Sequence, residues 1–368
     1  MVLLSGARSD GQDTLSAVDR RIVELVAEHR DAIVRVTGAR EGDDAQKSAQ
    51  AVIGTGFFIS RQGHALTNAS IVGNADRIWV EHRGVEYAAE LVGHDLASNI
   101  ALLRLRNLPA DFSFLHLGDS AELPRIGQTV LRLSMPLRFD ASPRLGIVAG
   151  AESSFGGRLF PCKYIRVAMD AGPGEGGSAY LDLSGRLIGV QVGALPEVDS
   201  SYVLPARAAQ RIRDDLLFSG EVTFGWMGFE VQDASSIASG RRLGLANVDG
   251  GSPAREAGLL EGDILLRIGG YEVRDIDDLR NAMFYTRVGQ FVEVEVRRDG
   301  EIESFSVRLA KRPDDEPLQY LRPLGRNTGP IAPTSEDAGA EREASPLLPR
   351  PSLLPEGSTR RDVPVNGG

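Results

Sequence analysis

A glycine-rich stretch in the middle of the chain has the residue types of a loop that presents a nucleophile. Residues 169–190, MDAGPGEGGSAYLDLSGRLIGV, combine clustered glycines, a tight turn and an apolar segment typical of a strand. Serine hydrolases use such a turn to expose a reactive serine, and Ser178 is the hydroxyl nearest to it. A serine attacks a carbonyl only when a neighbouring base takes its proton and a carboxylate stabilises the protonated base. Catalysis therefore depends on whether the chain supplies these partners.

The residue types give little support to other chemistries. Residues 172–178 lack the Lys-Ser/Thr pair of a phosphate-binding loop, and a strand follows them instead of a helix. The sequence has no HExxH pattern and a single cysteine, so we expect no metal, no cofactor and no internal disulfide. That cysteine, Cys162, is predicted to be a small buried hydrophobe. The acid pairs Asp214-Asp215 and Asp277-Asp278 lie on predicted helices, and we interpret them as solvated faces rather than a glycosidase pair.

The composition is that of a globular chain with more than one folded unit. Its 368 residues exceed the size of one usual core, and 42% of them are apolar and 25% charged. The apolar runs are too short to span a bilayer, so no transmembrane helix is expected. The net charge is -10 and the basic residues are interleaved with acids, which argues against binding to DNA or RNA.

The elements that must position the glycine loop are predicted to form a mainly β domain. An S-x-x-D capping pair and apolar spacing predict an amphipathic helix over residues 16–30. From residue 33 to about 204, many short strands are separated by Gly, Asp and Asn turns, which favours a closed or sandwiched β fold. A helix with Pro205 in its first turn and Gly220 as its stop ends this domain.

A second unit is predicted over residues 221–312. GGSPAREAGLLEGDILLRIGGYEV predicts a short helix, a strand and a hairpin turn, and DIDDLRNAMFYT predicts another helix. Two alternating strands then meet at Asp299-Gly300. Beyond Arg312 the chain is rich in proline, serine, glycine and charged residues, so we expect residues 313–368 to be a disordered tail. Residues 1–15 are expected to be a flexible N-terminus.

Several stretches resemble the HtrA/DegP-type, trypsin-like serine proteases. GTGFFISRQGHALTNASIVGNADRIWVEHRGVEYAAELVGHDLASNIALLRL, LGDSAELPRIGQTV and LGIVAG are similar to the protease domain of that family, and VLPARAAQRIRDDLLFSGEVTFGWMGFEV is similar to the junction into its PDZ domain. The resemblance covers residues 20–312. It implies a chymotrypsin-type double β-barrel over residues 16–220, an α+β PDZ domain over residues 221–312, and an N-terminal segment of the kind that often helps to form trimers.

The catalytic positions of this family can be located in the chain one by one. The family's histidine base lies in TN-x-H-V-V, where this chain has TNASIV and therefore Ser70. The family's aspartate lies in TDIALL, where this chain has SNIALL and therefore Asn99. The nucleophile belongs to PGNSGGPL, and alignment from the following strand places Gly176 there, whereas alignment from Asp170 places Ser178 there. The resemblance implies vacated triad positions and leaves Ser178 as the candidate nucleophile.

With Ser70 in place of the base and Asn99 in place of the carboxylate, we expect no proton transfer from a serine. A serine hydroxyl titrates far above neutrality and cannot act as the base, and asparagine has no charge to stabilise a protonated ring. None of the chain's histidines occupies the base position; outside the first helix they are predicted at strand ends and turns, as His64, His82, His94 and His116. We therefore expect no catalytic residue, although backbone N–H groups around residues 174–176 would still be able to form an oxyanion hole.

The second unit carries a peptide-binding signal. Trp226-Met227-Gly228-Phe229 resembles the loop with which PDZ domains hold a peptide's terminal carboxylate on successive backbone N–H groups. By the same resemblance, Leu279 and Met283 lie on a groove helix and are candidates for the wall of the pocket that receives the last side chain. Either residue could equally face the core.

These observations predict an HtrA-like pseudoprotease that binds polypeptide C-termini or unfolded segments, or regulates related HtrA-type proteases, without hydrolysis. Two alternatives stay open: an active serine endopeptidase that uses Ser178 with displaced catalytic groups, and a structural oligomeric scaffold with a silent PDZ domain. The first residues, MVLLSGARSDG, resemble the back end of a secretory signal. Together with the family resemblance, they predict a periplasmic or cell-envelope location and a homo-oligomer, a trimer by resemblance.

Overall fold

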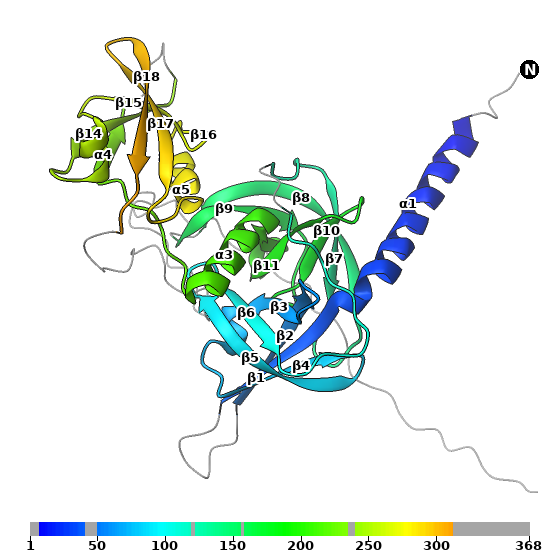
Figure 1. The fold of residues 1–368 in the computed structure, drawn as a ribbon. Helices are drawn as coiled ribbons and strands as arrows, with labels where there is room; N and C mark the ends of the chain where they lie inside the picture. Colours follow the sequence, from blue (N-terminus) through cyan, green and yellow to red (C-terminus); the bar gives the residue numbers. More distant parts are fainter. Residues whose placement is uncertain (1–6, 41–49, 119–121, 156–157, 235–239, 312–368) are drawn as a thin grey trace, which may run out of the picture. The chain divides into compact units, whose positions relative to one another are not determined.

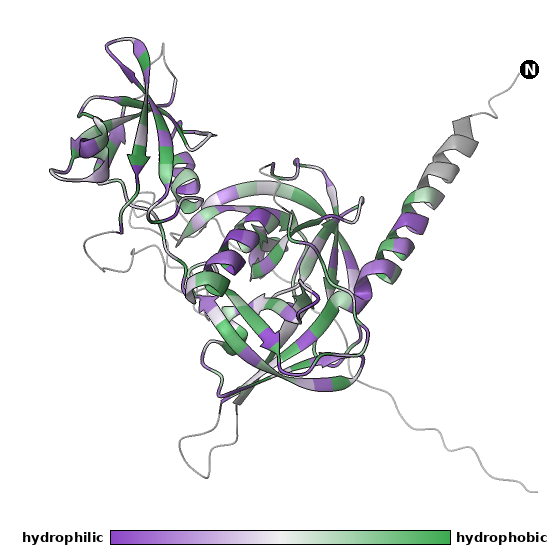
Figure 2. Ribbon diagram, viewed as in Figure 1, coloured by the Kyte–Doolittle hydropathy of each residue, from purple (hydrophilic) through white to green (hydrophobic). Residues whose placement is uncertain are grey.

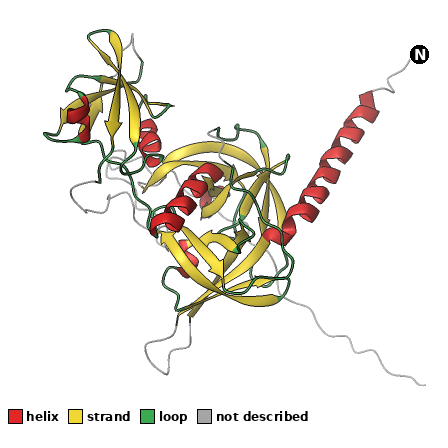
Figure 3. Cartoon of the chain, in the orientation of Figure 1, coloured by secondary structure: helices red, strands yellow, loops and turns green. Residues whose placement is uncertain are grey.

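Strands are the main secondary structure in a computed structural model of the chain (Figure 1, Figure 3). The structure describes residues 7–40, 50–118, 122–155, 158–234 and 240–311. The predicted disordered tail, residues 313–368, lies outside the described residues. No helix in the described ranges is long and apolar enough to cross a membrane.

The first barrel contains six antiparallel strands in the closed order β1-β2-β3-β6-β5-β4. Their bounds are β1 (Ile33–Arg40), β2 (Gln50–Phe58), β3 (His64–Asn68), β4 (Arg77–His82), β5 (Val85–Asp95) and β6 (Ile100–Leu105). Helix α1 (Ala7–His29) and the 3₁₀ turn η1 (Arg30–Ala32) precede β1, and the single turn α2 (Ala69–Val72) follows β3. Closure leaves no free strand edge in the barrel.

The second barrel repeats this arrangement in the order β10-β11-β12-β9-β8-β7. Its strands are β7 (Thr129–Ser134), β8 (Ser142–Phe155), β9 (Arg158–Ala168), β10 (Ala179–Asp182), β11 (Leu187–Leu195) and β12 (Ser200–Pro205), with the 3₁₀ turn η2 (Pro196–Val198) between the last two. The glycine loop connects β9 to β10. The predicted mainly β, double-barrel fold is confirmed.

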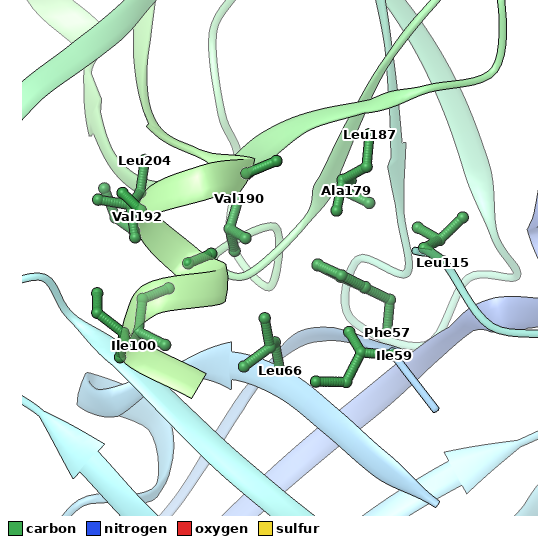
Figure 4. Close-up of a cluster of buried hydrophobic side chains, with 14 of the residues drawn as sticks. Phe57, Ile59, Leu66, Ile100, Leu115, Ala179, Leu187, Val190, Val192 and Leu204 are labelled. Atoms are coloured by element: carbon green, nitrogen blue, oxygen red, sulfur yellow. The ribbon is translucent and has the colours of Figure 1, made fainter. Parts of the chain in front are cut away.

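One apolar core extends through both barrels. Buried side chains of the first barrel, such as Phe57 and Leu66, join one cluster with Ala179, Val190 and Leu204 of the second (Figure 4). Hydropathy changes along the strands of both barrels, as expected where side chains alternate between core and surface (Figure 2). Burying each large aliphatic side chain is worth about 1.5–3 kcal/mol, so this shared core fixes one barrel against the other.

Helix α3 (Ala206–Ser219) packs on strands of both barrels and ends where the sequence predicts. Gly220 adopts φ +77°, the left-handed conformation that closes a helix and that glycine takes without strain. The start of α1 differs from the prediction, because the helix begins at Ala7 instead of residue 16. No proline interrupts residues 7–15, and extending a formed helix needs only one more hydrogen bond per residue.

The C-terminal unit is a sheet with two helices. The strands β13 (Phe229–Asp233), β14 (Leu243–Val248), β15 (Ile264–Ile268), β17 (Phe291–Arg298) and β18 (Glu301–Arg308) are adjacent in that order, and β16 (Tyr271–Glu272) pairs with β15. The helices are α4 (Pro253–Ala257) and α5 (Ile276–Phe284). Val292, Val294 and Val296 alternate into a core of their own. Strand β13 lies at the edge of the sheet and pairs with β14 alone among the described strands.

Candidate functional site

Thr55 ties the glycine loop of the second barrel to β2 of the first. Its backbone N–H donates to the Gly176 carbonyl at 2.9 Å, and its Oγ1 donates to the Gly174 carbonyl at 2.8 Å. Gly177 adopts φ +86°, and a Cβ there would lie 2.1 Å from the Thr55 carbonyl oxygen. A side chain at that position would meet backbone, so the close approach of the two barrels requires glycine.

A buried ion pair between Arg132 and Glu175 anchors the glycine loop. Arg132 on β7 is completely buried and donates to the Glu175 carboxylate at 2.6 Å, and Ser134 Oγ donates to the same oxygen at 3.2 Å. The second carboxylate oxygen accepts from the Gly172 N–H at 2.5 Å. A buried carboxylate requires such partners, because taking a charge out of water is costly. The pair therefore fixes the backbone of the loop while keeping the carboxylate away from its surface.

Ser178 is buried at the end of the glycine loop, directly before β10. Its side chain is completely buried, and its hydroxyl donates to the Glu175 carbonyl at 2.5 Å. The Ser178 N–H also donates to that carbonyl, at 3.2 Å, and the Ser178 carbonyl accepts from the Gln191 N–H at 2.9 Å. These contacts make the serine part of the turn that leads into β10.

Gly176 and Ser70 lie closer to solvent than Ser178. Gly176 is half-buried and its carbonyl is held by Thr55, as described above. Ser70 is the second residue of α2, and its side chain is exposed. The side chain of Gly176 is a hydrogen atom and that of Ser70 is a hydroxyl, and neither group takes up a proton near neutral pH.

Asn99 links the two barrels with its side-chain amide. Its Oδ1 accepts from the Ser70 N–H at 2.9 Å, and its Nδ2 donates to the Val192 carbonyl on β11 at 2.9 Å. The backbone adopts φ +58°, a left-handed conformation in which asparagine is several-fold enriched. An ionised carboxylate could make the first of these bonds but not the second, because it has no proton to donate. The amide is therefore matched to both partners.

Two of the histidines bind partners away from the glycine loop. His64 Nδ1 lies 2.9 Å from Ser60 Oγ, and burial lowers the pKa of the His64 ring. His82 Nε2 lies 3.0 Å from the Asp31 carboxylate. In the part of the chain that the structure describes, no histidine forms a hydrogen bond with any of the four positions considered for the triad, Ser70, Asn99, Gly176 and Ser178.

The loop at the start of β13 has free backbone donors. The Met227 carbonyl accepts from the Ala254 N–H at 2.9 Å, and the Gly228 carbonyl accepts from the Asp249 N–H at 3.0 Å. Gly228 adopts φ +78°, and a Cβ there would lie 2.3 Å from Ser252 Cβ. The N–H groups of Met227 and Gly228 donate to no acceptor within the described ranges. The carbonyls are thus tied down while the donors remain available to a ligand.

Apolar side chains of one cluster adjoin this loop. Met227 and Leu279 are buried and Phe229 and Met283 half-buried in one cluster of the C-terminal unit. Leu279 is 8% exposed and therefore mainly a core residue, whereas Met283 is more open. Because β13 is an edge strand, an extended peptide would be able to pair with it.

Comparison with known proteins agrees with this architecture. Residues 54–190 match the family described as trypsin-like peptidase domain, and residues 225–309 match the PDZ domain. A probable periplasmic serine endoprotease DegP-like from Marinomonas sp. (strain MWYL1) is 31% identical over 286 residues, which cover 73% of this chain and 59% of that protein. The protein of the same name from Pseudomonas putida (strain W619) is 30% identical over 322 residues, with 83% and 63% covered. The HtrA-type protease AlgW, solved with a tripeptide, aligns with a TM-score of 0.63 at 25% identity over 79% of this chain and 97% of its own.

The chain is a homologue of the HtrA-type serine endoproteases, with one PDZ domain. The predicted chymotrypsin-type double barrel followed by a PDZ domain is thereby confirmed. This HtrA homologue spans about three fifths of the length of the curated relatives that it matches, 59% of the Marinomonas protein. The peptidase match includes the glycine loop, and the PDZ match includes residues 226–229 and α5.

Sequence reasoning missed the residues of the HtrA homologue that hold the site together. Thr55 and Glu175 stand within the quoted motifs, but nothing in their identity shows which backbone groups they bind. Arg132 carried a signal, because it is a charged residue in the apolar run TVLRLS, where a buried strand favours a partnered charge. Cys162 is buried as predicted and burial raises the pKa of its thiol.

Proposed function

We propose that this HtrA homologue is a pseudoprotease that binds polypeptide C-termini and unfolded segments through its PDZ domain and does not cleave them. The observation that carries the proposal is that both polar atoms of the Asn99 amide make structural hydrogen bonds. Its oxygen accepts from the Ser70 N–H, and its nitrogen donates to the Val192 carbonyl. Proton abstraction needs a base and a carboxylate behind it. Ser70, Asn99 and Gly176 supply neither at the positions where relatives with the family's triad motifs would carry them.

The alternative of an active endopeptidase would have to use Ser178. That hydroxyl is completely buried and already donates to the Glu175 carbonyl, so a substrate carbonyl would need the turn to open before any attack. The alternative of a silent scaffold is disfavoured by the unengaged N–H groups of Met227 and Gly228, which are the donors a terminal carboxylate needs.

The relatives also suggest a cellular setting. The matched DegP-like proteins are named periplasmic, and we infer a periplasmic or cell-envelope location for this chain. We also infer a homo-oligomer, a trimer by family resemblance, and regulation of related HtrA-type proteases through shared peptide ligands.

One experiment tests binding and cleavage together. A fluorescent ten-residue peptide with an apolar C-terminal residue is mixed with the full chain, and anisotropy and mass spectra are followed for a day. We expect the anisotropy to rise and stay constant with the peptide intact, and a C-terminally amidated copy to bind more weakly. Fragments that appear in proportion to the protein concentration would overturn the proposal, as would equal binding of the two peptides.

A further inference from the structure

Strand β13, which follows the loop with free backbone donors, carries an unpaired carboxylate on its exposed face. Phe229 and Val231 pack against the core of the C-terminal unit. The alternate residues, Glu230 and Gln232, are exposed. Glu230 forms no ion pair and no side-chain hydrogen bond with any residue that the structure describes. A ligand paired with this edge strand would therefore meet a negative charge directly after the loop.

A second carboxylate lies on the same face as Glu230. Asn247 on β14 is the cross-strand partner of Glu230, and paired residues of neighbouring strands point to the same face of a sheet. The Asn247 Nδ2 donates to Asp249 Oδ1 at 3.1 Å. Arg255, the basic residue that follows on α4, is paired with Glu261 at 3.8 Å. The face that β13 turns away from the core is therefore acidic close to the loop.

The position of the loop determines how a bound peptide would run along β13. A terminal carboxylate held by the N–H groups of Met227 and Gly228 places the last peptide residue beside Phe229, at the start of the strand. The preceding peptide residues then lie beside Glu230 and beyond, so the peptide pairs antiparallel to β13. Because successive side chains alternate between faces, the last side chain shares the face of Phe229 and the penultimate one shares the face of Glu230.

We propose that the PDZ domain selects polypeptide C-termini whose penultimate residue is lysine or arginine. The charged group of that residue lies opposite Glu230, and oppositely charged cross-strand pairs are favourable. It also offsets the repulsion between the peptide's own terminal carboxylate and the carboxylates of Glu230 and Asp249. Two positions earlier in the peptide, the neighbour on the strand is the neutral Gln232, so the preference belongs to the penultimate residue. This inference rests on the proposed function, because it requires a peptide whose end is held at residues 227–228.

The test compares ten-residue peptides that share an apolar last residue and carry lysine, glutamine or glutamate at the penultimate position. Fluorescence anisotropy measures their affinities for the full chain at low ionic strength. We expect the lysine peptide to bind about threefold more tightly than the glutamine peptide, and the glutamate peptide about threefold more weakly. Added salt should reduce these differences, because it screens exposed charges.

The overall charge of the protein requires a control peptide. The net charge of -10 attracts any basic peptide, whatever the position of its lysine. The control has the composition of the lysine peptide, but its lysine is exchanged with a glutamine near the start of the peptide. We expect this isomer to bind about threefold more weakly than the lysine peptide. Equal affinities of the two isomers would overturn the inference.

Charge reversal in the protein tests Glu230 itself. Glu230→Gln should remove most of the preference, and Glu230→Lys should reverse it, so that the glutamate peptide binds more tightly than the lysine peptide. A misfolded variant would not produce such a reversal. The matched control, Glu301→Lys, makes the same change at an exposed position on β18, the opposite edge of the sheet, and should keep the preference for lysine.

The outcomes separate this inference from the proposed function. Equal affinities for the lysine, glutamine and glutamate peptides would overturn the inference alone, as would an unchanged preference in folded Glu230→Lys. Loss of binding for all peptides, or equal binding of their C-terminally amidated copies, would contradict the PDZ receptor itself. Cleaved peptide in the mass spectrum would contradict the pseudoprotease.

Discussion

The glycine loop of the second barrel and the loop before β13 share a backbone design. Each carries a glycine with positive φ, at Gly174 in one and Gly228 in the other. Each has its carbonyls tied down, by Thr55 in the barrel and by Asp249 and Ala254 in the PDZ domain. In both, backbone N–H groups are left without an acceptor within the described residues.

The two loops differ in what surrounds them. The PDZ loop leads into an edge strand whose Phe229 is half-buried in an apolar cluster, which suits an extended peptide. The barrel loop is surrounded by polar groups that bind one another, with Asn99 spanning the barrels and Ser178 bonded within its own turn. Backbone donors therefore depend on chain geometry, whereas proton transfer depends on side chains. A site can therefore lose its chemistry and keep its capacity to bind.

The largest effect is expected when the ion pair that supports the barrel loop is broken. Glu175→Gln removes one charge of a buried pair and leaves Arg132 uncompensated, which should lower the free energy of unfolding by about 3–5 kcal/mol. The control, Glu152→Gln, removes a carboxylate from a half-exposed pair with Arg166 and should cost less than about 1 kcal/mol. Urea unfolding measures both. Equal losses would mean that the buried pair does not hold the loop.

The second largest effect is expected when the conformation of the PDZ loop is disrupted. Gly228→Val places a branched side chain where φ is +78° and where a Cβ would already lie 2.3 Å from Ser252 Cβ. We expect peptide affinity at the PDZ site to fall about a hundredfold, which corresponds to about 2.7 kcal/mol. Gly250→Ala is the matched control, because a Cβ there meets nothing within 4 Å and the glycine has no positive φ. Fluorescence anisotropy measures the peptide affinity of each variant. An unchanged affinity in Gly228→Val would show that the peptide does not bind at this loop.

The smallest effect concerns the amide between the barrels. Asn99→Asp removes the donor to the Val192 carbonyl and should lower the free energy of unfolding by about 1–2 kcal/mol at pH 7. Repulsion from that carbonyl disfavours the charged carboxyl and raises its folded-state pKa above its unfolded value. The loss is therefore present at pH 7 and should shrink as pH falls toward the folded-state pKa, where the protonated carboxyl can donate. Unfolding between pH 7 and pH 5 checks the trend, with Asn74→Asp as the exposed control, and a loss that grows on acidification would contradict it.

The double barrel could be predicted because its signals are local. Turn residues separate the strands of both barrels, and Gly220 and Gly258 end helices in left-handed conformations as expected for glycine. The start of α1 could not be predicted from its capping pattern, since α1 begins nine residues before that pattern. Helix ends carry weak sequence signals, because fraying and extension differ little in free energy.

The sequence proposed the residues of the candidate site but not the bonds that they make. Motif spacing was enough to propose Ser70, Asn99 and Gly176, and the loop carrying Gly228. The pairing of Arg132 with Glu175 joins residues 43 positions apart, and that of Asn99 with Val192 joins residues 93 apart. Such contacts arise when strands close into barrels, so no local pattern encodes them.

The central claim is that the barrel holds no activated serine, and labelling with a fluorophosphonate tests it most directly. The full chain is incubated with the reagent beside an active trypsin-like protease, and the intact mass of each is recorded. We expect the protease to gain one adduct and this chain to gain none, with Ser178→Ala indistinguishable from the unmodified protein. A stoichiometric adduct that disappears in Ser178→Ala would contradict the account.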